Sequence, residues 1–380
     1  GAGGLPLVTK LGAKLGKYCN ADITLVDSSS IHVWKPRFHE VATGAIDADL
    51  DAVDYRAHAQ LNHYRFEPGT MTQVDTAGQT LTLAPLHDAH GSEVLPERKL
   101  SYDYLVLATG SQSNDFGTPG VRDNCLFMDS RAQAERFRER FLNACLHANY
   151  ENKPVSVAIV GGGATGVALA AELHHAVSML NFYGHEHLDR KHLQVDIIEA
   201  APRILPVLSE RVSATATKRL EGLGVKVRTG VMVAEATPDA LVPKDGDPIK
   251  ADLLVWAAGV KCPEWLSQID GLTTNRINQV EVEPTLQAKG QKNVFIIGDA
   301  AFLIPEGAER PIPPRAQSAQ QMAQHVDGQP ERRQLLRRRL ARPDDVHQPV
   351  SHAPGRALRL AAHHHVAHRR ALQQAGTPAP

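Results

Sequence analysis

Three glycines at the spacing G-x-G-x-x-G, Gly161, Gly163 and Gly166, form the most informative chemical pattern in the sequence. The first glycine permits a tight turn, the second lets backbone N–H groups approach a pyrophosphate, and the third lets a helix pack on a strand. Further along, Glu199 stands where a carboxylate accepts a hydrogen bond from a ribose 2′-hydroxyl and repels a 2′-phosphate. The pattern predicts a dinucleotide site that prefers NADH to NADPH.

A strand, a turn and a helix are needed to position these residues. The apolar run at residues 157–160 enters the first glycine, an alanine-rich helical stretch follows the third, and residues 195–198 form a second strand. A polar, histidine-rich insert at residues 184–192 lengthens the connection between them. A merely structural glycine loop is the alternative, but strand, helix and terminal acid together favour a cofactor site.

A second glycine pattern opens the chain. Gly1 and Gly4 stand as the second and third glycines of another G-x-G-x-x-G, residues 5–15 as its helix, and residues 21–26 as a strand ending in Asp27. The first strand and first glycine would lie upstream, so we expect a truncated chain; a glycine-rich tag is the alternative, but a tag would not arrange such a strand. Two dinucleotide folds predict a flavin in one and a nicotinamide in the other, because hydride transfer needs the rings stacked face to face.

Composition sets wide bounds on the class of protein. With 380 residues, 42% hydrophobic content and a formal net charge of −1, the chain can bury two or three domain cores and is typical of soluble globular proteins. No stretch approaches the length of a membrane span. The cysteines, Cys19, Cys125, Cys145 and Cys262, form no CxxC or CxxxxC pattern, which favours a reducing compartment and argues against a redox dithiol or a metal site.

Two further apolar strands end in small, turn-prone residues. The segment YDYLVLATG closes on Ala108, Thr109 and Gly110, and NVFIIGDAA contains Gly298 and Asp299. These segments resemble the flavoproteins with two dinucleotide-binding domains, in which the ATG turn links the domains and the aspartate contacts the ribityl or pyrophosphate part of FAD. The resemblance implies an α/β fold of the glutathione-reductase type, with two Rossmann-like domains and the NAD domain inserted in the FAD domain. It also implies that Asp299 is an FAD ligand.

A closer resemblance is to the type II NADH:quinone oxidoreductases, also called alternative NADH dehydrogenases. HVWKPRFHEVATGAID resembles their WKPxxHEVAxG signature, and AQSAQQ resembles their AQxAxQ quinone-site motif. The resemblance spans roughly residues 1–326, and its motifs occur in the family's order. It implies FAD and NADH as cofactors and quinone as substrate, with Lys35 and Ala316 beside the cofactor and Gln317 and Gln321 facing the quinone head group. For the two glutamines, simple solvent exposure is the alternative that the sequence alone favours.

Glu172 follows Gly166 on the predicted helix, among alanine, leucine and valine side chains. A carboxylate there is unfavourable unless it faces a cofactor or a partner. The family places this glutamate near the flavin and nicotinamide, which implies a tuning or proton-relay role; a satisfied helix glutamate is the equal alternative. Gly259, which closes the segment AAG, resembles the family's second-domain turn near the nicotinamide. The implied mechanism passes hydride from NADH C4 to flavin N5 and then two electrons to a quinone, without proton pumping.

The expected domain order is flavin fold, inserted nicotinamide fold, flavin fold. Residues 1–115 form the first part of the FAD domain, and residues 116–275 form the NADH domain. The NADH domain includes a connecting helix at residues 131–151 with a solvated Arg/Glu face, and a helical pattern at residues 203–223. Residues 276–326 complete the FAD domain and carry the quinone-site helix.

Residues 327–380 differ from the rest in composition. They contain ten arginines and six histidines but no lysine, isoleucine, phenylalanine, tyrosine, tryptophan, methionine or cysteine, so we expect them to be disordered. A basic arm for nucleic acid or an anionic membrane is one interpretation, and the absence of lysine and aromatic residues argues against it. Reading each codon one base later permits segments that resemble the family's membrane-proximal region. We therefore expect a wrong-frame tail in place of the membrane anchor.

The expected partners are a quinone and no nucleic acid, with a homodimer left open. The expected location is the cytoplasmic face of the cell membrane, peripherally bound, or the cytosol where the anchor is lost. Two alternatives remain. One is a sulfide:quinone or ferredoxin-type reductase of the same superfamily, the first of which needs a cysteine pair beside the flavin, whereas Cys125 and Cys262 lie in no such motif. The other is a product that binds nucleotide without catalysis.

Overall fold

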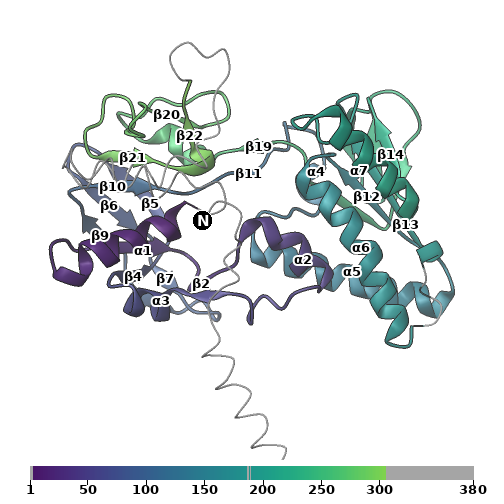
Figure 1. The fold of residues 1–380 in the computed structure, drawn as a ribbon, viewed down its shortest axis with the longest axis horizontal. Helices are drawn as coiled ribbons and strands as arrows, with labels where there is room; N and C mark the ends of the chain where they lie inside the picture. The colour runs from purple at the N-terminus through teal and green to yellow at the C-terminus, as the bar shows by residue number, and fades with distance from the viewer. Residues whose placement is uncertain (1–2, 186–187, 189, 305–380) are drawn as a thin grey trace, which may run out of the picture. The chain divides into compact units, whose positions relative to one another are not determined.

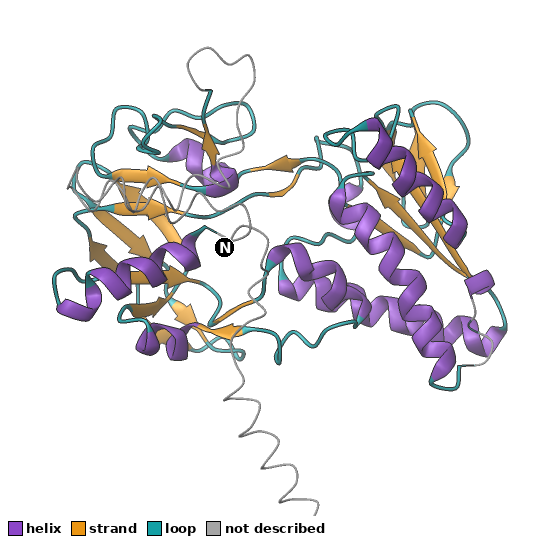
Figure 2. Cartoon of the chain, viewed as in Figure 1, coloured by secondary structure: helices purple, strands orange, loops and turns teal. Residues whose placement is uncertain are grey.

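The computed structural model describes residues 3–185, 188 and 190–304, which lie within one compact unit, Gly1–His325. Figures 1 and 2 show their helices and strands. We call residues 116–261 the inserted domain, and residues 3–115 together with 262–304 the outer domain. In the described part of the chain, no helix combines the length and the apolar composition that a membrane crossing requires.

A four-stranded parallel sheet with the order β14-β13-β12-β18 forms the centre of the inserted domain. The central strand β12 (Val155–Val160) is almost entirely buried, as expected for a parallel strand that is covered on both faces. It pairs with β13 on one side and β18 on the other. The flanking strands are β13 (Leu193–Glu199), β14 (Lys226–Thr229) and β18 (Leu253–Trp256). The two strands predicted around the glycine pattern are confirmed, and Glu199 is the last residue of β13.

Three helices pack with this sheet. The helix α6 (Ala164–Phe182) begins directly after the glycine turn, and α5 (Arg131–Glu151) begins with a capping box between Ser130 and Gln133. The charged face of α5 is exposed as predicted, but its other face is part of the domain core and buries Ala134, Phe137, Phe141, Cys145 and Ala148. It is therefore a core element as well as a connection.

The third helix, α7 (Glu210–Leu223), begins later than the helical pattern at residues 203–223 predicted. Leu205 has a positive φ of 49° and precedes Pro206, and a residue before proline is disfavoured in helical conformation. Residues 203–209 therefore form turns before the helix. A small antiparallel sheet and a short helix complete the domain: β15 (Val233–Ala236), β16 (Ala240–Pro243), β17 (Ile249–Lys250) and α4 (Val121–Asn124).

The described part of the outer domain contains three parallel strand pairs, one of them β20 (Val280–Glu281) with β22 (Ala301–Phe302), two antiparallel pairs and a three-stranded antiparallel sheet. Strand β1 (Thr24–Asp27) pairs with β4 (Arg65–Pro68), and β10 (Leu105–Leu107) pairs with β21 (Val294–Ile296). The antiparallel sheet has the order β5-β6-β9, from β5 (Met71–Asp75), β6 (Thr80–Leu83) and β9 (Arg98–Ser101). The predicted helix after the opening glycines is α1 (Gly4–Lys14), and the predicted strand that ends in Asp27 is β1.

Shorter elements connect these sheets. The remaining helices are α2 (Phe38–Thr43) and α3 (Tyr55–Leu61), with 3-10 turns η1 (Gly16–Tyr18), η2 (Lys35–Arg37), η3 (Arg190–His192), η4 (Glu264–Gln268) and η5 (Gly298–Ala300). The remaining strands are β2 (Ile31–His32), β3 (Val53–Asp54), β7 (Leu86–His87), β8 (Glu93–Leu95), β11 (Gln112–Ser113) and β19 (Val260–Lys261).

The side-chain packing departs from the expected domain boundaries at two places. Phe38, Val41 and Ala42 of α2 are buried in one hydrophobic cluster with residues of α5 and α6, although the sequence places them in the first segment of the outer domain. Residues from Cys262 to Ile269 pack with the core of the outer domain. The chain thus rejoins this core before the expected boundary at residue 276, because η4 buries Leu266 there.

Candidate cofactor sites

The first predicted site is the glycine turn between β12 and α6. Gly161 has a positive φ of 111°, and a Cβ placed on it would lie 2.7 Å from the carbonyl oxygen of Ala257. A Cβ on Gly166 would lie 2.1 Å from the carbonyl oxygen of Gly161, so the helix approaches the turn too closely for any side chain. Gly163 differs, because a Cβ there would meet no atom within 4 Å. The first and third glycines serve the fold, and the second leaves space at the N-terminus of α6, where N–H groups favour an anion.

Glu199 is hydrogen-bonded to the backbone of this turn. Its Oε2 accepts a hydrogen bond from the Gly162 N–H at 2.7 Å, and its Oε1 accepts one from the Ala201 N–H at 2.8 Å. A carboxylate has about four lone-pair sites, so both oxygens keep capacity for a ribose hydroxyl. The guanidinium group of Arg203, the nearest arginine along the chain, donates to the carbonyl oxygens of Leu205 and Pro206. It is therefore engaged by backbone and does not offer a ready partner for a 2′-phosphate.

The second predicted site lies in the outer domain, where three turns that are distant in sequence meet. A Cβ placed on Gly4, the first residue of α1, would lie 3.1 Å from the Cβ of Ala108 in the ATG segment. A Cβ placed on Gly3 would lie 3.2 Å from the Cδ1 of Ile297, which directly precedes the GD motif. The N-terminus of α1, the ATG turn and the GD turn therefore lie next to one another.

Hydrogen bonds join Lys35 and Asp299 through a residue that the sequence analysis missed. The hydroxyl of Ser111 donates to Oδ2 of Asp299 at 2.7 Å. Lys35 Nζ donates to the backbone carbonyl of Ser111 at 2.5 Å and to Oδ1 of Asp129 at 3.1 Å. The only available signal for Ser111 is that it follows Gly110 of the ATG turn. The structure thus brings together Lys35, the ATG turn and Asp299, and their role in binding FAD stays a prediction.

Asp27, at the end of β1, belongs to a partly buried polar network. The hydroxyl of Tyr55 donates to Oδ2 of Asp27 at 3.2 Å, and Nδ1 of His32 lies 3.0 Å from the same hydroxyl oxygen. Because the tyrosine proton goes to Asp27, Nδ1 of His32 carries a proton and donates to Tyr55. Burial lowers the pKa of His32 to about 4 and raises the pKa of Tyr55, so His32 is neutral at pH 7. Neither Tyr55 nor His32 was predicted to lie beside Asp27.

The segments that connect the two domains are held together near Gly259. This glycine has a positive φ of 62°, and a Cβ on it would lie 2.3 Å from Cζ of Phe116, so the phenyl ring packs against its backbone. The Trp256 indole N–H donates to the carbonyl of Asn114 at 2.8 Å. The strands β11 and β19 pair antiparallel next to these contacts. The packing of Phe116 alone is sufficient reason for a glycine at position 259.

The structure does not test the roles predicted for the other candidate residues. Glu172 is half-buried on α6, and its tuning or proton-relay role stays a prediction. Gly1, Ala316, Gln317 and Gln321 lie outside the described residues, and so do the quinone-site helix and residues 327–380.

Burial keeps three of the cysteines in the thiol form. Cys125, Cys145 and Cys262 are buried, and burial raises the pKa of each thiol to about 12. The Cys262 thiol contacts the backbone carbonyl of Asp299 at 3.4 Å. A reactive cysteine needs a lowered pKa, so these thiols do not provide a nucleophilic thiolate at pH 7.

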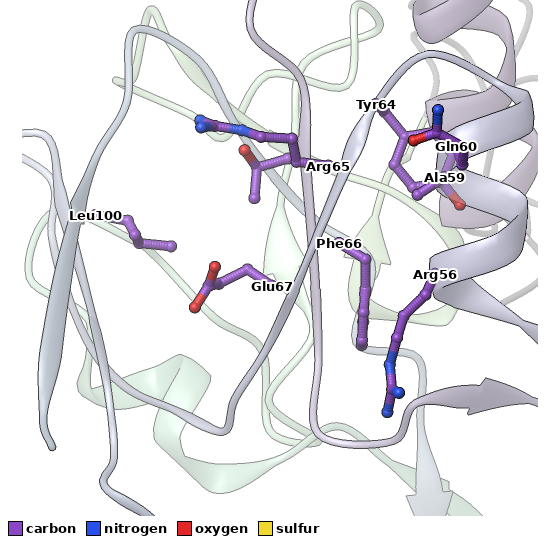
Figure 3. A pocket seen from close by; sticks show the side chains of 9 residues that line it. Arg56, Ala59, Gln60, Tyr64, Arg65, Phe66, Glu67 and Leu100 are labelled. Atoms are coloured by element: carbon purple, nitrogen blue, oxygen red, sulfur yellow. The ribbon is translucent and has the colours of Figure 1, made fainter. Parts of the chain in front are cut away.

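A hollow of about 390 Å³ lies between the strand pair β1–β4, helix α3 and strand β9 (Figure 3). The guanidinium groups of Arg56 and Arg65 point in different directions in this view, and Glu67 is paired with Arg98 at 2.6 Å. The side chains do not converge on a common point, and the hollow includes no residue singled out from the sequence. It is lined by Thr24, Arg56, Ala59, Gln60, Tyr64, Arg65, Phe66, Glu67 and Leu100.

Comparison with known proteins decides the family. The model of the pyridine nucleotide-disulphide oxidoreductase family matches residues 1–323. A type II NADH:quinone oxidoreductase from Haemophilus influenzae is 45% identical over 341 residues, which cover 85% of this chain and 76% of the relative. The chain belongs to the type II NADH:quinone oxidoreductases. A type II NADH:quinone oxidoreductase from Mycobacterium tuberculosis is 29% identical over 341 residues, covering 86% of this chain and 69% of the relative.

Solved structures of the same fold extend beyond the type II family. NDH2 from Plasmodium falciparum in complex with NADH superposes with a TM-score of 0.68 at 20% identity, covering 79% of this chain and 63% of that chain. The sulfide:quinone oxidoreductase from Aquifex aeolicus gives a TM-score of 0.66 at 18% identity, covering 87% of this chain and 76% of that chain. These likenesses confirm the α/β fold with two dinucleotide-binding domains that the motifs implied.

Proposed function

We propose that this protein is an FAD-dependent NADH:quinone oxidoreductase that moves hydride from NADH to the flavin and two electrons onward to a quinone, without pumping protons. The observation that supports the proposal is that residues predicted for each nucleotide site lie close together in the fold. The glycine turn of the inserted domain is open at Gly163 and has Glu199 beside it. In the outer domain, Gly4, the ATG turn and Asp299 meet.

The residues of the outer domain fit FAD. The N-terminus of α1 offers N–H groups to a pyrophosphate, and the carboxylate of Asp299 offers acceptor sites to ribityl hydroxyls. Asp27, at the end of β1, has the position of an acid that binds a ribose, and Tyr55 and the Ser29 N–H hold it in place. Bound flavin supplies the hydride acceptor and the two-electron donor of the reaction. Lys35 and Ser111 orient Asp299 and the ATG turn around that cofactor.

The residues of the inserted domain fit NADH. The N-terminus of α6 attracts the pyrophosphate, and Glu199 accepts the ribose hydroxyl while it holds the glycine turn through the Gly162 N–H. We further propose that Glu172 tunes this site or relays a proton, and that Gln317 and Gln321 contact the quinone. These roles follow from the family resemblance.

The experiment that tests the function measures NADH oxidation by the purified protein with a soluble quinone, with ferredoxin and with sulfide plus quinone. Bound yellow flavin together with quinone-dependent NADH oxidation would support the proposal. A sulfide:quinone or persulfide reaction needs a reactive thiolate, and the raised pKa values of Cys125 and Cys262 favour the quinone reaction of NADH instead. Turnover with ferredoxin or sulfide but not with NADH and quinone would contradict the proposal. Bound NADH and flavin without any turnover would identify a binding protein without catalysis.

We also propose that the quinone reaction takes place at the cytoplasmic face of the cell membrane, where a lipid-soluble quinone is available. Cosedimentation of the protein with quinone-loaded vesicles tests this location. The quaternary structure, including a homodimer, is tested by light scattering of the purified protein.

A further inference from the structure

Asp299 is held at two atoms, and one of its partners belongs to a loop with no assigned role. Its carboxylate accepts the hydroxyl of Ser111, and its backbone carbonyl accepts the side-chain amide of Gln279 at 2.8 Å. The thiol of Cys262 contacts the same carbonyl oxygen at 3.4 Å. The next residue, Ala300, is fully buried, so this carbonyl lies beside the core and requires partners from the protein.

Hydrogen bonds within the loop at residues 275–279 orient the side-chain amide of Gln279 toward Asp299. The side-chain oxygen of Asn275 accepts hydrogen bonds from the N–H groups of Ile277 and Gln279, both at 3.0 Å. The side-chain nitrogen of Asn275 donates to Oε1 of Gln279 at 3.0 Å, which leaves the amide nitrogen of Gln279 directed at Asp299. Asn275 therefore fixes both the backbone of the loop and the orientation of the Gln279 amide group.

The same loop is tied to the segment that re-enters the outer domain. The Cys262 N–H donates to the carbonyl of Ile277 at 2.8 Å, and the side chain of Asn278 donates to the carbonyl of Cys262 at 3.3 Å. Cys262 and Gln279 therefore belong to one hydrogen-bonded frame, and both reach the Asp299 carbonyl. The frame connects the GD turn to the chain segment that leaves the inserted domain.

We propose that Gln279 is a positioning residue for FAD, which acts by fixing the orientation of Asp299. A trans peptide is planar, so a hydrogen bond to the Asp299 carbonyl fixes the plane of the peptide that joins it to Ala300. With Ser111 on the carboxylate and Gln279 on the carbonyl, both ends of the residue are constrained. Without Gln279, the carbonyl loses its side-chain amide donor, the thiol of Cys262 is a weaker donor, and the carboxylate loses its fixed approach to the flavin ribityl chain. This inference rests on the proposed FAD site.

The test compares Gln279→Leu and Gln279→Glu with the control Gln291→Leu. Gln291 also donates its amide to a backbone carbonyl of the outer domain, that of Gly271 at 3.1 Å, but it has no bond to Asp299. FAD is removed from each protein and titrated back, with the dissociation constant read from flavin fluorescence. The visible spectrum of the bound flavin and the melting temperature of the FAD-free protein are measured in parallel. Gln279→Glu retains the size of the side chain and keeps the test valid if the leucine variant does not fold.

We expect both Gln279 variants to bind FAD about tenfold more weakly than the natural protein, since the Asp299 carbonyl loses the amide donor of Gln279. The flavin spectrum should change in these variants only. Gln291→Leu and the Gln279 variants should lower the melting temperature of the FAD-free protein by similar amounts. Gln291→Leu should nevertheless leave the FAD dissociation constant unchanged. Equal FAD affinity in all four proteins would overturn the inference for Gln279. Failure of the natural protein to bind FAD would instead overturn the proposed function.

Discussion

Replacing Glu199 by glutamine tests how the inserted domain selects its nucleotide. The carboxylate accepts one N–H on each oxygen, from Gly162 at 2.7 Å and from Ala201 at 2.8 Å. Glutamine has one acceptor oxygen, so its NH₂ group must face one of these donors. A hydrogen bond to a charged group contributes about 1.5–3 kcal/mol, and 1.4 kcal/mol corresponds to about a tenfold change in affinity. We therefore expect NADH to bind about 10- to 100-fold more weakly to Glu199→Gln.

The effect on NADPH should differ in size. A 2′-phosphate meets the negative carboxylate in the natural protein, and the neutral amide removes this repulsion. The disturbed turn and the relieved repulsion act in opposite directions on NADPH, so its binding should change less than that of NADH. The preference for NADH should consequently narrow by about tenfold or more.

The assay titrates both nucleotides by fluorescence and measures kcat/KM with each at constant quinone. Asp196→Asn is the matched control, because Asp196 lies on the same strand and accepts a hydrogen bond from Arg228 at 2.6 Å without contacting the glycine turn. This variant should keep the preference for NADH. The reasoning is refuted if the natural protein uses NADPH as well as NADH, or if Glu199→Gln and Asp196→Asn give the same ratio.

Three further predictions concern single residues of the two sites. Ser111→Ala should weaken FAD binding by about tenfold, because Asp299 loses a hydrogen bond to its carboxylate; flavin titration measures this, and unchanged affinity would contradict the contact. Gly163→Val should abolish NADH binding with little loss of stability. Gly166→Ala should lower the free energy of unfolding by about 1–3 kcal/mol, since a Cβ at Gly166 meets backbone and a Cβ at Gly163 does not. Urea unfolding with NADH titration distinguishes the two variants. His32 has a folded pKa of about 4, below its unfolded value of about 6.5, so its contribution to stability is complete above pH 6.5 and is lost as the pH falls toward 4. His32→Asn should reduce this pH dependence in melting experiments, and an unchanged slope would assign the dependence to other groups.

The parts of the fold that sequence predicted are those that depend on neighbours in the chain. The glycine turn at Gly161 and the strand that ends in Glu199 are local patterns of apolar runs and small residues, and both were found where expected. The start of α7 was predicted too early, because a helical pattern of apolar residues does not register the effect of Pro206 on Leu205. The position of α2 was not predictable, since its burial against α5 and α6 depends on tertiary packing.

The same distinction applies to the candidate sites. Asp299 was identified from its motif, but Ser111 and Gln279 were not, because each is a common polar residue that gains meaning only from the atom it contacts. The polar network at Asp27 is of the same kind, since Tyr55 and His32 belong to separate elements and are joined by the Tyr55 hydroxyl. Motifs therefore reveal the groups that touch a cofactor more readily than the groups that hold them.

Glu199 both contacts the nucleotide and holds the glycine turn, so the nucleotide preference is difficult to change at this position alone. The side chain both presents an acceptor to the ribose and satisfies the N–H groups of Gly162 and Ala201. Removal of the charge by glutamine leaves one of those two donors without its acceptor, and Arg203 is already bonded to the carbonyls of Leu205 and Pro206. A variant that uses NADPH well must therefore supply a new acceptor for the turn as well as a new cation for the phosphate. Single substitutions at Glu199 should weaken the preference for NADH without producing an enzyme that is efficient with NADPH.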